Sequence, residues 1–197
     1  MNHRDIFNSI YSKNLWGYGS GTGSLADNTQ EYRRFLHNFL RSNQIRSVVD
    51  IGCGDWQFSR LMDWKGIRYI GIDVSDVVLL NTQQFVNDGV SFICADVRHE
   101  PLPSAELVLI KDVMQHWSNE DIVTFLPRLS QFQQALIING FHPSLIHLLN
   151  LNISVGSCRP VDLRKAPFNL RGHYINWLQF DEPKWIFHWQ RNGEAGT

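Results

Sequence analysis

From residue 46 to residue 139 the chain alternates between short β-branched or aliphatic runs and stretches with helical spacing. The apolar runs predict five strands, which are Arg46–Ile51, Arg68–Asp73, Val90–Ala95, Glu106–Lys111 and Ala135–Asn139. Helices are predicted between them over Phe58–Trp64, Asp76–Asn87 and Ser118–Leu129, the last with Ser118 and Asp121 placed as a capping box. Strands that alternate with helices are typical of a parallel sheet with helices on both faces.

The regions on either side of this alternation differ from it. Residues 16–24 are rich in glycine, which predicts a flexible loop, and apolar residues at helical spacing predict a helix over Thr29–Leu40. Residues 141–172 mix Pro, Asn, Gly and Arg, which predicts an irregular segment of the kind that forms lids and binding loops. His173–Phe180 and Lys184–Gln190 predict an antiparallel hairpin. The expected fold class is therefore α/β, with a mostly parallel, doubly wound, Rossmann-like sheet and a C-terminal hairpin.

Composition argues against several classes of protein. The formal net charge of −1 lacks the excess of basic residues typical of a protein that binds duplex DNA. No apolar run reaches the roughly 18 residues that a membrane span needs, and the start, Met1–Asp5, is too polar for a signal peptide. The three cysteines are not spaced as CxxC pairs, so neither a disulfide framework nor a metal site is expected, and a reducing cytoplasm fits best.

The strongest functional signal is a glycine pair, Gly52 and Gly54, at the carboxyl end of the first predicted strand. In doubly wound sheets the ligand lies outside the carboxyl ends of the strands, where glycine lets the backbone approach it closely. Alone this pattern is weak, but acidic residues follow the next two strands. Asp73 is placed to accept hydrogen bonds from both hydroxyls of a ribose, and Asp96 to accept one from an adenine amine.

The residues after the glycine pair distinguish between adenosine cofactors. A dinucleotide fingerprint requires a third glycine so that a helix N-terminus can hold the pyrophosphate, and Gln57 stands at that position. Asp55 would also bring a negative charge toward the phosphates. A cofactor without phosphates, such as S-adenosylmethionine with its sulfonium and ammonium groups, suits these residues better, which disfavours a nicotinamide oxidoreductase.

Four ordered segments resemble the class I S-adenosylmethionine-dependent methyltransferases, a family with a seven-stranded Rossmann-like fold. They are Asp50–Gly54 (DxGxG), Tyr69–Asp73 (YIGID), Ala95–Val97 (ADV) and Leu107–Trp117 (LVLIKDVMQHW). The glycine-rich segment from Trp16, the pair Tyr32-Arg33, Arg159–Leu163 (RPVDL) and Pro167-Phe168 are similar to small bacterial methyltransferases associated with glycan or natural-product pathways. The chain departs from the superfamily after Gly140, where no clear helix links the fifth strand to the hairpin.

The resemblance implies a set of cofactor-binding residues. Those at the glycine pair would line the methionine half, those at Asp73 the ribose, and those at Asp96 the adenine, while Lys111 would lie beside the transferred methyl group. Arg33, on the N-terminal helix, is a further candidate to pair with the cofactor carboxylate, although it also suits a solvated helix face. The complete set is Arg33, Asp50, Gly52, Cys53, Gly54, Asp73, Val74, Asp96, Val97 and Lys111.

Two residues after the fourth strand are candidate catalytic residues. Asp112 and His116 are four residues apart, so in a helical turn they would share one face. A hydroxyl acceptor must lose its proton during methyl transfer, and histidine titrates in the range that suits a general base. The alternative is that His116 packs structurally or contacts adenine beside Trp117.

We therefore expect a single domain over residues 1–197, in which 1–45 form a lid and helix, 46–140 the cofactor-binding core, and 141–197 the substrate-side loop and hairpin. The expected function is methylation of oxygen or nitrogen on a small molecule in natural-product or glycan metabolism, in the cytoplasm. The alternatives are a methyltransferase that acts on protein or RNA, and a nucleotide-binding module without catalysis. Neither DNA nor a membrane is expected as a partner, and the sequence leaves the acceptor and the oligomeric state open.

Overall fold

The computed structural model describes residues 2–141, 143–179 and 183–191 and separates into two units, one ending at Pro103 and the other beginning at Ser104. Each unit is described by itself. The expected subdivision of a single domain, with boundaries near residues 45 and 140, stays a prediction. Within the described ranges, no helix is long and apolar enough to cross a membrane.

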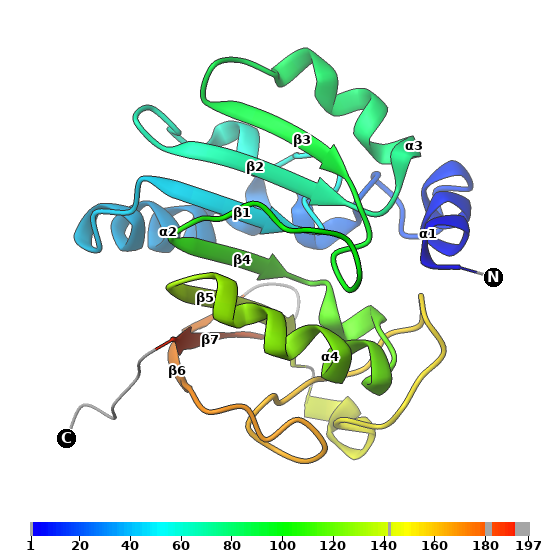
Figure 1. Ribbon diagram of the computed structural model, residues 1–197. Coiled ribbons are helices and arrows are strands. Elements are labelled where there is room, and N and C mark those ends of the chain that lie inside the picture. Colours follow the sequence, from blue (N-terminus) through cyan, green and yellow to red (C-terminus); the bar gives the residue numbers. More distant parts are fainter. Residues whose placement is uncertain (1, 142, 180–182, 192–197) are drawn as a thin grey trace. The chain divides into compact units, whose positions relative to one another are not determined.

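The first unit is built on three parallel strands, β1 (Ser47–Ile51), β2 (Arg68–Asp73) and β3 (Val90–Cys94), in the order β3-β2-β1 (Figure 1). All three agree with the predicted strands to within one residue. β1 and β2 are buried along almost their whole length, whereas β3 is buried at Val90 and alternates between exposed and partly buried positions after it. Because the strands are parallel, their carboxyl ends lie at one edge of the sheet.

Two helices accompany this sheet. The predicted helix α2 (Gln30–Ser42) is confirmed, with buried residues at positions 32, 36 and 40. Helix α1 (His3–Ser12) was not predicted from the sequence; it begins where the Asn2 side chain accepts a hydrogen bond from the backbone N–H of Asp5. Figure 1 shows α1 beside the carboxyl ends of β1–β3.

The helix predicted over Phe58–Trp64 is wrong. Only a 3₁₀ turn, Ser59–Leu61, forms there. The indole Nε1 of Trp64 donates to the carbonyl of Ser59 at 2.7 Å, and the Met62 N–H donates to the same carbonyl at 3.1 Å, so a side chain shares the carbonyl with the 3₁₀ turn.

The helix predicted over Asp76–Asn87 is only partly formed. An α-helical turn, α3 (Asp76–Leu79), continues as a 3₁₀ helix, Leu80–Phe85. The Thr82 hydroxyl donates to the carbonyl of Leu79 at 2.8 Å, and this local bond accompanies the change to the tighter helix.

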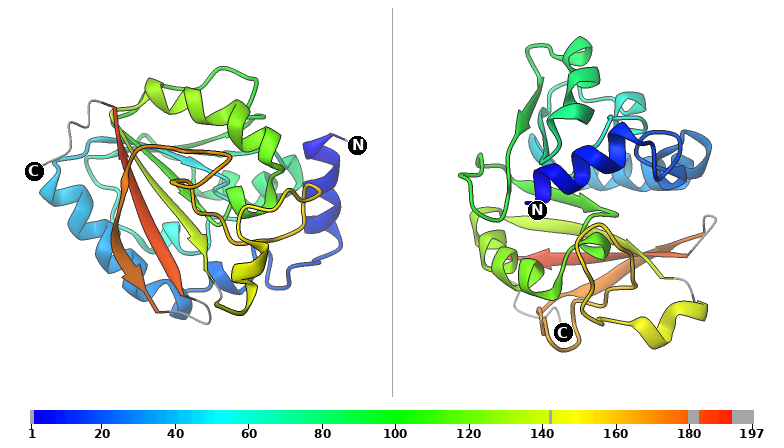
Figure 2. Two further views of the ribbon diagram at one scale, coloured as in Figure 1. Left: turned by 90° about the horizontal axis from the view of Figure 1, so that it is seen from below. Right: turned by 90° about the vertical axis from the view of Figure 1, so that its right-hand side faces the viewer.

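The second unit holds two parallel strands, β4 (Leu107–Lys111) and β5 (Gln134–Gly140), both buried throughout. β7 (Lys184–Gln190) pairs with β5 and β6 (His173–Leu178) pairs with β7, both in antiparallel fashion, which gives the order β4-β5-β7-β6 (Figure 2). The predicted hairpin is confirmed, although residues 180–182 at its tip lie outside the described ranges.

Helix α4 (Asn119–Phe125) begins at the predicted capping box. The backbone N–H of Asp121 donates to the Ser118 hydroxyl at 3.1 Å, and that of Ser118 donates to the Asp121 carboxylate at 3.2 Å. The helix is shorter than predicted and continues as a 3₁₀ helix, Leu126–Gln131, with Pro127 near its start. Proline lacks the N–H that the predicted α-helix would need in its third turn.

The irregular character predicted for residues 141–172 is confirmed for the described part of this segment, which contains only the 3₁₀ helix Pro143–Leu148. Arg159, in this segment, is almost fully buried. The guanidinium of Arg159 donates to the carbonyl of Met114 at 2.6 Å and to the side chain of Asn119 at 2.9 Å. Side-chain hydrogen bonds of this kind replace the backbone pairing that the segment lacks.

Candidate functional site

The loop that carries the glycine pair folds around the end of β2. Gly52 and Gly54 have left-handed φ values of 69° and 57°, which glycine adopts at little cost. The backbone N–H groups of Gly52 and Cys53 both donate to the carbonyl of Ile72, at 2.7 and 3.2 Å. Gly54 N–H donates to the Asp73 carboxylate at 3.1 Å. The structure thus brings together the glycine pair and the acidic residue that sequence reasoning placed at neighbouring strand ends.

Asp73 is a buried carboxylate with unused acceptor capacity. Its Oδ2 accepts from Gly54 and its Oδ1 from the backbone N–H of Ser75 at 2.9 Å. Burial raises the pKa of Asp73 from 3.8 to about 6, because it outweighs these backbone hydrogen bonds, and the charge of Asp55 adds to the rise. A carboxylate offers about four lone-pair positions, so it can accept further donors such as the two hydroxyls of a ribose.

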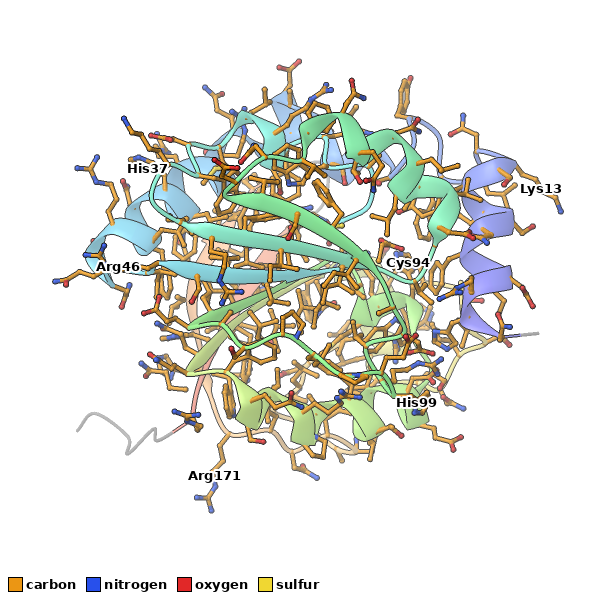
Figure 3. All side chains as sticks on the ribbon, turned by 45° about the horizontal axis from the view of Figure 1, so that its top comes forward. Lys13, His37, Arg46, Cys94, His99 and Arg171 are labelled. Carbon is orange, nitrogen blue, oxygen red and sulfur yellow. The ribbon has the colours of Figure 1, made fainter. Side chains whose placement is uncertain are left out.

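Two residues beside Asp73 and the glycine pair, Cys53 and Val74, have further contacts within the first unit. Cys53 is buried, and burial followed by the charge of Asp73 raises its thiol pKa well above the ordinary value, so it packs as a neutral side chain. The carbonyl of Val74 accepts from Arg4 Nε at 3.3 Å and from the Cys94 thiol at 3.7 Å. Figure 3 labels Cys94 where β3 ends.

The Asp50 carboxylate accepts hydrogen bonds from side chains within the core of the first unit. It accepts from the Tyr69 hydroxyl at 2.5 Å and lies 3.5 Å from the Ser59 hydroxyl. Burial, and then the charge of Asp50, raise the pKa of Tyr69, so the tyrosine stays neutral and donates. Its role toward the methionine half of a cofactor stays a prediction.

Asp96 has an arginine partner that sequence reasoning missed. Arg98 Nε donates to Oδ1 at 2.9 Å and Nη2 to Oδ2 at 2.5 Å, which is a bidentate ion pair. Burial raises the pKa of Asp96, but the hydrogen bonds and charge of Arg98 outweigh burial and lower it overall. Val97, between the two, is buried. The only local signal for this pair is the two-residue spacing from Asp96 to Arg98.

The glycine-rich segment packs on the loop of the glycine pair. The Ser20 hydroxyl accepts from Asp55 N–H at 3.1 Å, and the Gln57 amide donates to the carbonyl of Tyr18 at 2.5 Å. A Cβ at Gly19 would lie 2.1 Å from an Asp55 carboxylate oxygen, and one at Gly54 would lie 2.2 Å from the Ser20 hydroxyl oxygen. Gln57 stands where a dinucleotide fingerprint would have its third glycine. In the structure its side chain joins the glycine-rich segment to the loop of the glycine pair.

Arg33 lies on α2 and is partly buried. Its Nη2 donates to the carbonyl of Ala26 at 2.9 Å, while its buried Nε has no partner among the described residues. A guanidinium with an unused donor fits the carboxylate that the sequence assigned to it.

In the second unit, Asp112 lies between two lysines. Its carboxylate is 2.6 Å from Lys111 Nζ and 2.6 Å from Lys184 Nζ, and both lysine side chains are almost fully buried. Burial raises the pKa of Asp112, but the two cations outweigh burial and hold it far below the ordinary value. A carboxylate held in this way is suited to positioning lysines and poorly suited to accepting a proton near neutral pH. The assignment of Lys111 to the cofactor stays a prediction.

The expected helical turn that would join Asp112 and His116 does not form. Asp112 has a left-handed φ of 58°, and the following residues form a 3₁₀ turn, Met114–His116. The i and i+4 relation of an α-helix therefore does not apply to this pair, and that expectation is wrong.

His116 is held in one tautomer by a backbone carbonyl. Its Nδ1 lies 2.9 Å from the carbonyl oxygen of Ser157, which can only accept, so Nδ1 carries the proton. Nε2 is then unprotonated and lies 3.4 Å from the Gln115 amide nitrogen. Burial foremost lowers the pKa of His116, so the ring is neutral at pH 7. A neutral imidazole whose Nε2 is unprotonated is the form that a general base requires.

The 3₁₀ turn that carries His116 is fastened from two sides. The Gln115 side-chain oxygen accepts from the backbone N–H of Gly140 at 2.8 Å, at the end of β5. From the irregular segment, Gly156 N–H donates to the carbonyl of His116 at 2.9 Å and Arg159 N–H to that of Gln115 at 3.2 Å. Across the described ranges of both units, no group of three or more His, Cys, Asp or Glu residues is arranged to hold a metal ion.

Comparison with known proteins identifies relatives over much of the chain. Residues 48–134 match a family described as a methyltransferase domain. An O-methyltransferase of Zea mays is 25% identical over 145 residues, which cover 72% of this chain and 37% of that protein. The chain thus spans well under half the length of this curated relative.

Solved structures resemble the chain along almost its entire length. The N-methyltransferase NodS of Bradyrhizobium japonicum, in complex with S-adenosyl-L-homocysteine, has a TM-score of 0.72 at 12% identity and covers 96% of this chain and 100% of its own. The magnesium protoporphyrin IX methyltransferase of Synechocystis, with the same compound bound, has a TM-score of 0.65 at 18% identity and covers 94% and 95%. At these identities the likeness shows that the chain shares their fold.

Proposed function

From its membership in the class I S-adenosylmethionine-dependent methyltransferases, we propose that this chain transfers the methyl group of S-adenosylmethionine to oxygen or nitrogen of a small molecule. The predicted Rossmann-like fold, with mostly parallel strands and a C-terminal antiparallel hairpin, is confirmed. The proteins named above include an O-methyltransferase and an N-methyltransferase, which supports this acceptor class. We expect the protein to act in the cytoplasm.

One observation carries the cofactor assignment: the hydrogen bond that joins the Asp73 carboxylate to the Gly54 N–H. It places an acceptor with unused lone pairs beside a loop in which Gly52 and Gly54 carry no side chains of their own. We propose that Asp73 binds the ribose hydroxyls, that Gly52 and Gly54 line the methionine half, and that Arg33 pairs with the cofactor carboxylate. Asp96 and Val97 would bind the adenine, with Arg98 holding the Asp96 carboxylate in place.

S-adenosylmethionine, when bound, supplies an activated methyl group on a sulfonium. This chain must provide orientation and, for a hydroxyl acceptor, removal of a proton. We propose that His116 Nε2 accepts that proton, because the Ser157 carbonyl fixes the opposite nitrogen as the protonated one. Asp112 would take no part in proton transfer and would position Lys111 and Lys184.

Titration calorimetry tests the cofactor assignment. The purified chain should bind S-adenosylmethionine and S-adenosylhomocysteine, and Asp73→Ala should weaken binding by roughly 2–3 kcal/mol, because two ribose hydroxyls lose their charged acceptor. Asp63→Ala, which removes an exposed carboxylate of the same unit, is the matched control and should leave the affinity unchanged. The absence of heat for either compound would overturn the proposal.

A release assay for S-adenosylhomocysteine across phenols, sugars, amines, peptides and RNA tests the acceptor class. Turnover with a phenol, sugar or amine supports the proposal. Turnover confined to peptides or RNA would favour a macromolecular methyltransferase. Cofactor binding without turnover on any of them would favour a binding module.

A further inference from the structure

A small cavity of about 10 Å³ lies in the second unit, and no step of the proposed function uses it. Its walls come from β5, β7 and the irregular segment, and they include Ile137, Asn139, Trp185, Phe187, Val161 and Leu163. Asn139 pairs with Trp185 and Ile137 with Phe187, so these four side chains lie on one face of the sheet. A cavity of this size holds about one water-sized group, such as a hydroxyl.

The cavity contains a polar side chain with unused hydrogen-bonding capacity. Asn139 is 7% exposed, and its buried Oδ1 has no partner among the described residues. Tyr174 also lines the cavity, but its hydroxyl already donates to the Asp162 carboxylate at 3.1 Å. The terminal torsion of asparagine is soft, so the Asn139 amide can turn and present its oxygen or its nitrogen to the cavity. A buried amide of this kind calls for an explanation, which a ligand group in the cavity supplies.

The lining of the cavity favours a neutral ligand. Every residue that lines it is uncharged. Lys184, next to Trp185 on β7, lies on the opposite face of the sheet, where it contacts Asp112. Beside the Tyr174 ring, Arg164 is already paired with a carboxylate of its own segment at 3.2 Å. An ion that entered the cavity would lose its hydration without gaining an opposite charge.

An aromatic surface connects the cavity with solvent. Trp185 lines the cavity and is also 37% exposed, so its indole reaches from the cavity to the surface. Trp177, its partner on β6, is 46% exposed, and the two ring centroids are 6.4 Å apart with the planes at 53°. Aromatic groups favour offset and edge-to-face contacts, so an aromatic ligand can pack against two indoles that are tilted in this way.

Both walls of the cavity are fastened to the turn that carries the proposed base, His116. The strand wall is joined to this turn by the Gly140 N–H, which donates to the Gln115 side chain at 2.8 Å. The wall from the irregular segment is joined to it by the Arg159 N–H, which donates to the Gln115 carbonyl at 3.2 Å. A ligand held in the cavity is therefore held beside the turn on which proton removal is proposed to occur.

On the basis of the proposed function, we propose that this cavity orients the methyl acceptor and that the acceptor is a neutral aromatic compound with more than one polar substituent. One hydroxyl enters the cavity and forms a hydrogen bond with the Asn139 amide. The ring packs against Trp185 and Trp177. A second hydroxyl or amine of the same ring stays outside the cavity, where it is available for methylation.

Fluorine NMR of the full chain labelled with 5-fluorotryptophan tests the site in the absence of cofactor, with resorcinol as the neutral probe. The chain holds seven tryptophans, and Trp185→Phe assigns the relevant signal. Resorcinol should shift the Trp185 signal in a saturable manner. The carboxylate α-resorcylate, which is the same ring with one negative charge added, should bind about tenfold or more weakly. Equal affinity for the two compounds would overturn the preference for a neutral ligand.

Two asparagine variants separate the cavity from general attraction of phenols. Asn139→Leu removes the amide and keeps most of its volume, so it should weaken resorcinol binding about three- to tenfold. Asn176→Leu is the matched control, because Asn176 pairs with Ile186 and lies on the opposite face of the hairpin; it should leave the affinity unchanged. No saturable shift, as when the cavity holds only an ordered water, would overturn the site, and so would equal loss in both variants.

The acceptor role has its own measurement. With resorcinol as the acceptor in the release assay, Asn139→Leu should raise the KM about three- to tenfold, and an unchanged KM would overturn the acceptor role. The failure of the proposed function looks different, because it appears in calorimetry as the absence of cofactor binding. Resorcinol binding to the cofactor-free chain decides the cavity site in either case.

Discussion

Replacing Asp73 by Asn should change how the stability of the ligand-free protein depends on pH. The carboxylate is buried, and burial raises its pKa from 3.8 to about 6. Between these two values the folded state binds a proton that the unfolded state has already released. Stability therefore falls as pH rises through this range, in the opposite sense to a carboxylate with a lowered pKa.

The size of the effect follows from the shift. A difference of about two pKa units corresponds to about 3 kcal/mol. The free energy of unfolding of the wild type, minus that of Asp73→Asn, should therefore fall by about 3 kcal/mol between about pH 3.5 and pH 7. Taking the difference removes the contributions of other titrating groups, and the constant cost of an amide that accepts only one of the two backbone N–H groups does not affect the slope.

Urea denaturation, followed by circular dichroism at a series of pH values, measures this difference. Asp96→Asn is the matched control with the opposite sign, because the hydrogen bonds of Arg98 outweigh burial and lower the pKa of Asp96. The wild type should gain stability over Asp96→Asn as pH rises and lose that gain as pH falls. A flat or rising difference for Asp73→Asn would refute the claim that burial dominates at this carboxylate.

Three further predictions concern the other parts of the site. His116→Ala should reduce kcat by about 10²–10⁴ for a hydroxyl acceptor with little change in cofactor affinity. Because burial lowers the pKa of His116, the wild-type rate should persist below pH 6.5. An unchanged kcat in the variant would exclude His116 as the general base. Arg159→Lys should destabilise the protein by about 1–3 kcal/mol in urea denaturation, because the shorter group cannot reach both Met114 and Asn119; an unchanged midpoint would contradict this. Hydrogen exchange over residues 17–24 should slow on cofactor binding if this loop is a lid, and equal exchange in both states would leave it a packed loop only.

The sequence predicted those features that depend on local pattern and on the geometry of parallel strands. Every strand from β1 to β7 begins and ends within two residues of its prediction, because β1–β5 are short apolar runs and β6 and β7 are the two arms of the predicted hairpin. The pairing of Asp73 with Gly54 could be anticipated because the carboxyl ends of neighbouring parallel strands meet at one edge. Helices proved harder, since side chains competed for the backbone carbonyls of Ser59 and Leu79.

What the sequence could not predict arises from residues far apart along the chain. Lys184 and Asp112 are 72 positions apart in the sequence, and no local pattern near either residue predicts their ion pair. Ser157 reaches His116 across 41 positions, through an irregular segment with no periodicity to read. Both contacts change the chemistry of the residues that the sequence had singled out.

These two contacts resolve which candidate base the structure favours. Sequence spacing treated Asp112 and His116 as equivalent members of one helical face, but the left-handed backbone at Asp112 removes that face. Two lysines then keep the Asp112 carboxylate ionised and occupied, so accepting a proton would require breaking an ion pair. His116 is the reverse case, because the Ser157 carbonyl holds the protonated nitrogen and the other nitrogen, Nε2, is in the unprotonated, basic form. Accepting a proton would cost Asp112 the charge that its two lysines stabilise, whereas the neutral imidazole of His116 is already the basic form, so of the two residues the structure favours His116.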